Sequence, residues 1–369
     1  MFDRRLLENF DWILLLLVLA ICGLGLLAMY SATFGSGIKS GYLVRQSYWM
    51  LIGLGVALVT LFIHYRTWAQ MGLVLHLAVV VLLVLVLLYG TGGPGSPVER
   101  WLRVGPVFVQ PSEFSKFTLV LALSYQLRDN SQFQNRGRLY WLIPLMLIGI
   151  PFVLIIRQPD LGTALLLIII SFPILFLMGL RVKTLITLGV LAVAILPLAW
   201  LYVLKPYQKD RVLTFLNPER DPLGAGYHVI QSKIAVGSGQ LWGKGLGAGT
   251  QGQLNFLPAN HTDFIFSVFS EEWGFLGSLT VLFLFMLLTL WALSGVLKTR
   301  DRLGAIQTVG VVAIITSHVL INIGMTLGLM PVVGVPLPFF SYGGSSMLSM
   351  MFGVGLLLNI RMRRFEVVT

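Results

Sequence analysis

Charge is scarce in this sequence, and its scarcity excludes a soluble protein. Only 11% of the 369 residues are charged, whereas a typical soluble domain carries about 25%. Hydrophobic residues make up 56% of the chain, and its mean hydropathy is +0.85. So few charged residues cannot cover the surface of a water-soluble fold of this length. The composition therefore indicates a protein that lies in a lipid bilayer.

Cysteine, metal-ligand spacings and long basic blocks are also lacking. The single cysteine, Cys22, lies within the first apolar run, so no internal disulfide can form and we interpret it as a packing residue. The five histidines do not stand at the spacing of a zinc site. No basic block is longer than residues 361–364, so the net charge of +11 does not indicate nucleic-acid binding. We attribute that charge to loop residues that orient spans and attract anionic lipid headgroups.

Apolar runs long enough to cross a bilayer, about 20 residues each, recur along the whole chain. The first run follows Arg4 and Arg5 and is longer than the core of a signal peptide, so we interpret it as an uncleaved span. Backbone groups in hydrocarbon must satisfy one another, and the runs show no period-2 alternation, which indicates helices. We predict an all-α fold, one polytopic membrane domain over residues 1–369, with ten transmembrane helices at about residues 12–30, 46–63, 69–89, 112–127, 139–156, 160–178, 184–204, 264–294, 305–328 and 339–360.

Lysine and arginine are distributed unevenly between the two ends of these spans. With a cytoplasmic N-terminus, most of them fall in cytoplasmic segments: Arg4, Arg5, Arg66, Arg128, Arg136, Arg138, Arg181, Lys183, Lys298, Arg300, Arg302, Arg361, Arg363 and Arg364. The short outer segments hold fewer: Lys39, Arg45, Arg100, Arg103 and Arg157. Because short cytoplasmic loops are enriched in lysine and arginine, we expect both termini in the cytoplasm. This topology also predicts one large extracytoplasmic loop, 205–263. Residues 226–236 within it have the pattern of an amphipathic helix.

Four polar clusters lie at the outer ends of the spans in this topology. They are Glu99–Leu102 with Gln110–Glu113 and Lys116; Arg157–Gly162; His261–Phe264; and Pro336–Pro338 with Ser341–Ser346. Because all four clusters face the same side of the membrane, we expect them to form one site.

Each cluster also has a purely structural interpretation, which stays open. Glu113 and Lys116 stand three residues apart on a helix and can neutralise each other. Asp160 and Asp263 precede predicted helices and could serve only as their N-terminal caps. The small residues within 341–346 could serve only for close helix packing.

The functional interpretation joins the four clusters into one chemistry. A carboxylate at a water-accessible membrane rim, beside apolar surface, can have a raised pKa and act as a general base. Nearby arginines and lysines, or a divalent cation, would bind a phosphate-rich leaving group and stabilise its departure. The combination suits a lipid-linked pyrophosphate whose tail lies in the bilayer and whose sugar head faces outward.

In their order along the chain, these motifs resemble the SEDS family (shape, elongation, division and sporulation) over essentially the whole sequence. Residues 217–233 and 249–251 are most similar to its elongation branch, RodA rather than FtsW or SpoVE. Each matching motif is weak alone, and the ordered set is specific: Gln110–Glu113 with Lys116, Gln158–Gly162, Leu257–Phe266, Glu271–Glu272, and Pro336–Pro338 with Ser341–Gly344.

The resemblance implies a peptidoglycan glycosyltransferase that polymerises lipid II at the outer face of the bacterial cytoplasmic membrane, for cell elongation and rod shape. The growing glycan on undecaprenyl pyrophosphate is the expected donor, and the sugar 4-hydroxyl of the next lipid II is the expected acceptor. An α-linked donor that gives a β-1,4 product requires inversion, and hence a single displacement with one base.

The resemblance also implies roles for single residues. Asp263 matches the family's essential aspartate, so we expect it to be the catalytic base or to hold a divalent cation, Mg²⁺ or Mn²⁺. Glu113 and Lys116 match paired charges of a central cavity, and Asp160 matches another buried acid. No organic cofactor is expected. Four basic residues are expected to contact the pyrophosphate: Arg100, Arg211, Lys233 and Lys244.

The expected partners are lipid II, a class B penicillin-binding protein that acts as transpeptidase, other elongation-complex membrane proteins and membrane lipids, without nucleic acid. Three alternatives stay open. A lipid II flippase would also carry intramembrane charges, although a transporter places them near the midplane with access from both sides. A non-catalytic scaffold for the partner synthase would need no base, and a division or sporulation paralogue would use the same chemistry.

Overall fold

The computed structural model describes residues 8–33, 40–92, 99–105, 107–128, 141–177, 206–221, 225–254, 261–299 and 301–364, with residues 256, 257 and 259 and scattered positions between 179 and 203. Most of the described part is helical. A helix satisfies its backbone groups internally, so the long apolar helices can lie in lipid.

Six described helices are long and apolar enough to cross a membrane: α2 (Trp12–Thr33), α3 (Ser40–Phe62), α4 (Tyr65–Tyr89), α13 (Ile265–Lys298), α14 (Arg302–Thr326) and α15 (Gly344–Met362). Three shorter helices lie at further predicted spans: α5 (Pro111–Gln126), α7 (Leu142–Arg157) and α8 (Leu161–Leu177). The predicted span 184–204 is described only at interrupted positions, so the count of ten stays a prediction.

A small sheet between α4 and α5 corrects the purely α-helical prediction. Strands β1 (Thr91–Gly92), β2 (Glu99–Val104) and β3 (Val107–Val109) are antiparallel in the order β1-β2-β3. The β2–β3 turn includes Gly105, whose φ of +61° is a conformation that glycine adopts without a steric penalty. These residues lie beyond the end of α4, where paired strands can satisfy the backbone as well as a helix does.

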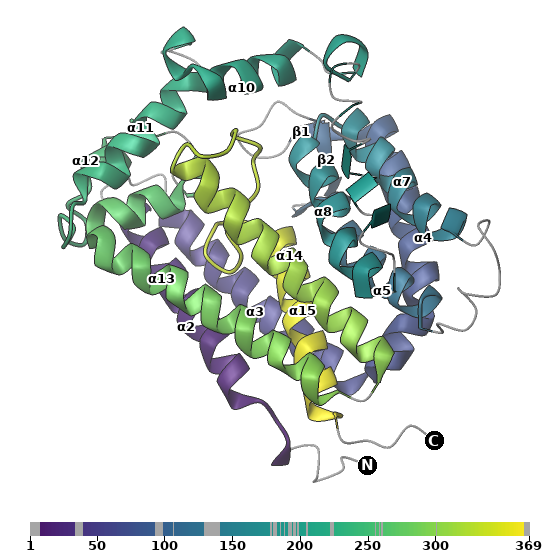
Figure 1. Ribbon diagram of the computed structural model, residues 1–369. Helices are drawn as coiled ribbons and strands as arrows, with labels where there is room; N and C mark the ends of the chain where they lie inside the picture. The colour runs from purple at the N-terminus through teal and green to yellow at the C-terminus, as the bar shows by residue number, and fades with distance from the viewer. Residues whose placement is uncertain are drawn as a thin grey trace.

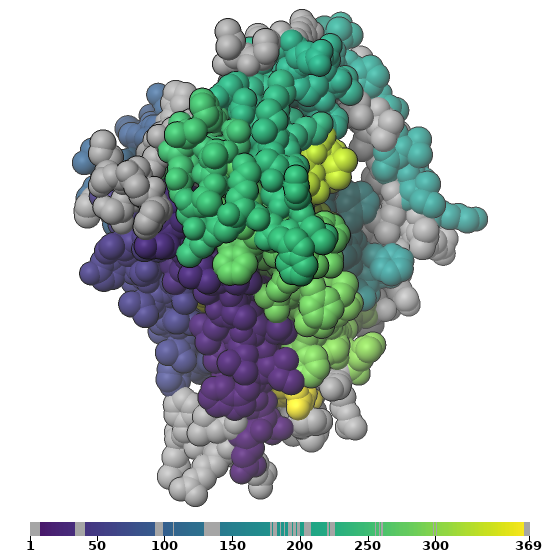
Figure 2. Space-filling view, turned by 90° about the vertical axis from the view of Figure 1, so that its left-hand side faces the viewer, coloured from purple at the N-terminus to yellow at the C-terminus, as the bar shows by residue number. Residues whose placement is uncertain are grey.

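One end of the bundle carries almost all of the irregular structure (Figure 1). The strands lie there, with α10 (Pro206–Leu216), α11 (Ala225–Ser238), α12 (Thr250–Gln253) and the loop 327–343 that joins α14 to α15. The beginning of α2 and the end of α15 lie at the opposite end. Figure 2 shows the green surface of the 225–265 segment directly above the purple surface of α2. Helix α11 confirms the helix predicted for residues 226–236.

Helix α13 bends where it passes the glycine-rich part of the long loop. Gly274 has φ 66° and ψ −161°, outside the helical region. A Cβ added at Gly274 would lie 2.3 Å from the backbone nitrogen of Gly243, so only glycine permits this close approach of the two segments. The bend therefore lets the loop lie against the first turns of α13.

A buried ion pair connects three helices at the other end of the bundle. Arg361 was predicted in a cytoplasmic loop, but it lies in α15 with only 2% of its surface exposed and forms an ion pair with Asp11. The Trp291 indole of α13 donates to both carboxylate oxygens of Asp11 at 3.0 Å, and the Leu14 backbone N–H donates to one of them. Asp11 therefore compensates the arginine charge and caps α2 at once.

We expect Asp11→Ala to destabilise the protein by about 3–5 kcal/mol, because the substitution leaves the charge of Arg361 buried without its partner. Asp11→Leu combined with Arg361→Met removes both charges and should recover much of the lost stability. Thermal unfolding of the purified protein in a neutral detergent measures both effects. Equal losses in the single and the double variant would contradict the assigned role of the ion pair.

Candidate active site

Asp263 lies just before α13 and is held through its backbone. The side-chain amide of Asn322 donates to the backbone carbonyl of Asp263 at 3.0 Å and to that of Val335 at 2.8 Å. The N-cap of α13 is Phe264, without a side-chain cap, so Asp263 does not cap this helix. Among the described residues, no hydrogen bond to the Asp263 carboxylate is present. The carboxylate is thus placed by its backbone and left available for chemistry.

Two arginines set the electrostatic environment of this carboxylate. Burial raises the pKa of Asp263, the charges of Arg100 and Arg211 oppose that rise, and the negative charge of Asp160 adds to it. A Cβ added at Gly334 would lie 3.5 Å from Oδ2 of Asp263 and 3.9 Å from Nη2 of Arg100, so both groups border that glycine. Arg211 donates to the carbonyl of Val332 at 3.1 Å.

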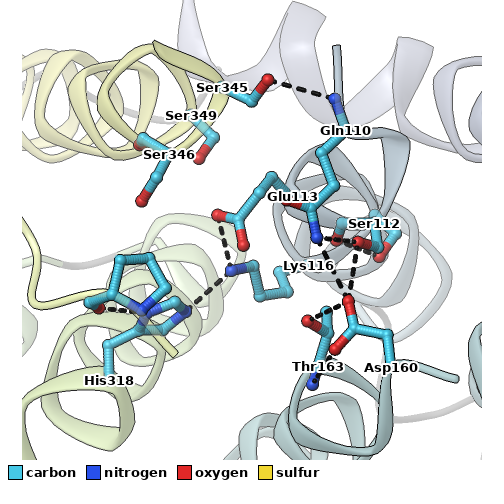
Figure 3. A network of polar contacts seen from close by, with 12 residues as sticks. Gln110, Ser112, Glu113, Lys116, Asp160, Thr163, His318, Ser345, Ser346 and Ser349 are labelled. Carbon is cyan, nitrogen blue, oxygen red and sulfur yellow. Dashed lines mark hydrogen bonds and ion pairs between the residues drawn. The ribbon is translucent and has the colours of Figure 1, made fainter. Parts of the chain in front are cut away.

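Asp160 links the α5 and α8 segments to Arg100. The backbone N–H and the hydroxyl of Thr163 donate to its carboxylate at 3.2 and 2.9 Å, so Asp160 caps α8 as the structural interpretation proposed. The same carboxylate accepts from Gln110 at 3.1 Å and lies 3.6 Å from Nη1 of Arg100. Asp160 is therefore both a cap and the partner of Arg100. Figure 3 shows the contacts of Asp160 with Gln110 and Thr163.

Lys116 is buried between an acid and a histidine. Its ammonium lies 2.9 Å from Oε2 of Glu113 and 2.7 Å from Nε2 of His318 (Figure 3). Because an ammonium has only donors, Nε2 accepts and the proton lies on Nδ1, which donates to the carbonyl of Pro336 at 3.1 Å. Glu113 and Lys116 do neutralise each other, and the pair also extends through His318 to the loop 327–343.

The loop 327–343 and the start of α15 bring the remaining clusters together. The Tyr342 backbone N–H donates to the carbonyl of His261 at 2.9 Å, and the Ser341 hydroxyl donates to that of Thr262 at 2.7 Å. The Ser345 hydroxyl accepts from the backbone N–H of Gln110 at 3.1 Å. All four clusters predicted from the sequence therefore meet at one end of the bundle.

The small residues of this segment also serve helix packing. A Cβ added at Gly344 would lie 2.6 Å from a ring carbon of Trp49 in α3, and one added at Gly355 would lie 2.7 Å from the carbonyl of Ala57. The packing interpretation of the motif is thus correct for Gly344, while its serines hold the loop.

Two of the predicted pyrophosphate contacts lie elsewhere. The Lys244 ammonium is 2.7 Å from Oε1 of Glu271, whose carboxylate also accepts the backbone N–H of Thr250 at 2.9 Å. Lys233 is exposed on α11 and lies beside Gly328. Within the described ranges, no contact joins either lysine to Asp263.

Sequence reasoning missed His318 and Asn322. They stand four residues apart on α14, on one helix face, and both are fully buried. The available signal was a pair of polar residues at helical spacing inside an apolar span. A search for metal-ligand spacing does not identify a histidine that positions a neighbouring group.

The residues at Asp263 fit a divalent cation only if the substrate shares it. No group of three or more histidine, cysteine, aspartate and glutamate side chains in the described part could hold a metal ion. Mg²⁺ is often held by one or two carboxylates together with substrate phosphates and water. Asp263 could supply such a carboxylate, with the remaining ligands coming from the pyrophosphate and solvent.

The comparisons with known proteins cover almost the whole chain. It is 39% identical over 359 residues to the peptidoglycan glycosyltransferase MrdB of Escherichia coli (strain K12), which covers 96% of this chain and 94% of the relative. It is 37% identical over 362 residues to the probable peptidoglycan glycosyltransferase FtsW of Trichlorobacter lovleyi, with 96% and 93% covered.

Two solved structures have the same fold. The crystal structure of the rod shape determining protein RodA of Thermus thermophilus matches with a TM-score of 0.72 and 30% identity, over 97% of this chain and 98% of that one. A chain in a peptidoglycan synthase complex that coordinates polymerization and crosslinking matches with a TM-score of 0.82 and 32% identity, over 97% and 99%. Residues 11–366 match the cell cycle protein family FtsW/RodA/SpoVE. The chain therefore belongs to this family, as the resemblance of its motifs predicted.

Proposed function

We propose that this chain is a peptidoglycan glycosyltransferase that polymerises lipid II into glycan strands during cell elongation. Two relatives that span nearly the whole chain are named for this activity. The observation that carries the proposal is the partly buried carboxylate of Asp263, which has no hydrogen-bond partner in the described part and stands in the field of Arg100 and Arg211. We further propose ten spans with both termini in the cytoplasm, so that Asp263 faces outward.

In the proposed reaction, Asp263 acts as the general base. Its carboxylate takes the proton of the acceptor 4-hydroxyl while that oxygen attacks the anomeric carbon of the donor. The bond from that carbon to the undecaprenyl pyrophosphate breaks, and its electron pair leaves with the pyrophosphate. Burial raises the pKa of Asp263, which makes the ionised carboxylate a stronger base than an exposed aspartate.

Arg100 and Arg211 are the proposed contacts to the departing pyrophosphate. Both border the loop segment next to Asp263, and guanidinium groups can donate two parallel hydrogen bonds to phosphate oxygens. Lys233 and Lys244 would act farther along the bound lipid, and Lys244 would have to leave Glu271 to do so. A divalent cation, Mg²⁺ or Mn²⁺, would neutralise further charge on the pyrophosphate when bound through Asp263.

Glu113, Lys116 and Asp160 are proposed to support the site. Lys116 and His318 connect α5 to the carbonyl of Pro336, and Asp160 holds the Arg100 side chain from the other side. These contacts fix the two segments that border Asp263. Because these charged groups are already oriented in the free protein, substrate binding costs little free energy of reorganisation.

The proposed partner is a class B penicillin-binding protein that cross-links the new strands in the cytoplasmic membrane. A structural neighbour at 32% identity comes from a peptidoglycan synthase complex that coordinates polymerization and crosslinking. Other elongation-complex membrane proteins and membrane lipids complete the proposed surroundings. A division or sporulation role would use the same chemistry with a different partner.

We expect Asp263→Asn to reduce polymerisation by about a hundredfold or more, because positioned general bases contribute roughly 10²–10⁴-fold. The assay is glycan-strand formation from labelled lipid II by purified protein, with its partner synthase, in detergent. Asp210→Asn, which changes an exposed aspartate of α10, is the matched control and should keep parental activity. Polymerisation by Asp263→Asn at the parental rate would exclude this residue as the base. No polymer from the parental protein in detergent, with transfer of lipid II between leaflets after reconstitution into vesicles, would instead favour a flippase.

The pH dependence of the same assay tests the environment of Asp263. The base must be ionised, so the rate should fall as pH falls through a pKa that burial has raised. This fall in rate is the acidic limb of the pH–rate profile. Since the charge of Arg100 lowers the pKa of Asp263, Arg100→Gln should move the acidic limb to higher pH. Arg103→Gln, on the same strand, should leave the limb in place. A limb that stays unchanged in Arg100→Gln would contradict the proposed coupling of the two groups.

A further inference from the structure

A polar cavity lies at the end of the bundle opposite Asp263. It has a volume of about 280 Å³ and is lined by residues of the start of α4, the end of α5 and the start of α14: Arg66, Gln70, Arg128, Asp301 and Leu303. None of these residues belongs to the candidate active site. We name it the basal cavity.

The charge of the basal cavity favours an anion. The single acid, Asp301, is already engaged, because it lies 3.4 Å from Nε of Arg66, accepts the Tyr65 hydroxyl at 2.8 Å, and caps α14 through the Leu303 N–H. The Arg128 guanidinium stacks over the Tyr125 ring at 4.1 Å, which fixes its plane and leaves the N–H donors of its edge for an acceptor. Two arginines against one acid give the cavity a net positive charge.

An exposed apolar stripe leads away from the cavity along α4. Gln70 in the cavity wall is followed at helical spacing by Val74, Leu77 and Val81, which are 69%, 54% and 58% exposed. These side chains therefore share one face of a helix that crosses the bilayer, beginning at the cavity. A phosphate in the cavity would thus have hydrocarbon directly beside it.

We propose that the basal cavity binds the phosphate of an anionic glycerophospholipid, with one acyl chain along the Val74–Val81 stripe of α4. Basic pockets between spans at the cytoplasmic side are suited to such headgroups. Arg128 and Arg66 donate hydrogen bonds to the phosphate oxygens, and Gln70 donates to the headgroup. The assignment to the cytoplasmic leaflet rests on the orientation proposed above, whereas the binding itself does not.

Native mass spectrometry of the purified protein, titrated with phosphatidylglycerol in a neutral detergent, tests the proposal. The parental protein should retain the lipid, and Arg128→Gln should weaken its binding about tenfold, the loss expected for charge-assisted hydrogen bonds. Arg302→Gln removes a partly exposed arginine from the same end, outside the cavity lining, and should bind like the parental protein. Zwitterionic phosphatidylcholine should bind more weakly than phosphatidylglycerol.

Three results would overturn the proposal. They are parental affinity in Arg128→Gln, equal binding of phosphatidylcholine and phosphatidylglycerol, and displacement of the lipid by millimolar inorganic phosphate, which would indicate a site for free anions. Size-exclusion chromatography of Arg128→Gln, together with its polymerisation of lipid II at the parental rate, shows that the variant is folded. Asp263→Asn should bind the lipid normally, so failure of the glycosyltransferase proposal leaves this test intact.

Discussion

Within a bundle that lipid surrounds, a charged side chain stays ionised only where another group of the protein compensates its charge, because no water is present to do so. The structure follows this constraint at each buried ionic position described above. Arg361 is compensated by Asp11, Lys116 by Glu113, and Asp160 by Arg100 and four hydrogen-bond donors. The Arg361–Asp11 and Asp160–Arg100 pairs join segments that are far apart in the sequence, so the compensation of charge there also fixes how the segments pack.

Asp263 differs from these acids in a way that matters for chemistry. Its backbone is held firmly by Asn322, whereas its carboxylate is surrounded by charge without a direct partner in the described ranges. A carboxylate that is oriented but uncommitted can accept a proton from a substrate at little cost in reorganisation. Asp160, by contrast, is saturated with donors and is better suited to hold Arg100 in place.

The sequence predicted the class of fold and the meeting of the four polar clusters, because both follow from local rules. Hydrophobic run length locates spans, and the asymmetry of lysine and arginine places their ends on two sides. The sequence could not predict the burial of Arg361, since that position depends on Asp11, 350 residues earlier in the chain. Nor could it predict His318 and Asn322 as positioning residues, because their partners, the carbonyls of Pro336, Val335 and Asp263, are backbone groups that leave no signature. For Lys244 the sequence predicts a substrate contact, and it could not show that the fold pairs this lysine with Glu271 when no substrate is bound.

The most direct test of the account is the distance between the Asp263 carboxylate and the acceptor 4-hydroxyl oxygen. It can be measured by cryo-electron microscopy of the parental protein with lipid II and a non-reactive donor analogue. The account predicts that these oxygens lie within hydrogen-bond reach, about 2.6–3.2 Å, with the donor pyrophosphate against Arg100 and Arg211. An acceptor hydroxyl that lies beyond reach of Asp263 and next to a different side chain would contradict it.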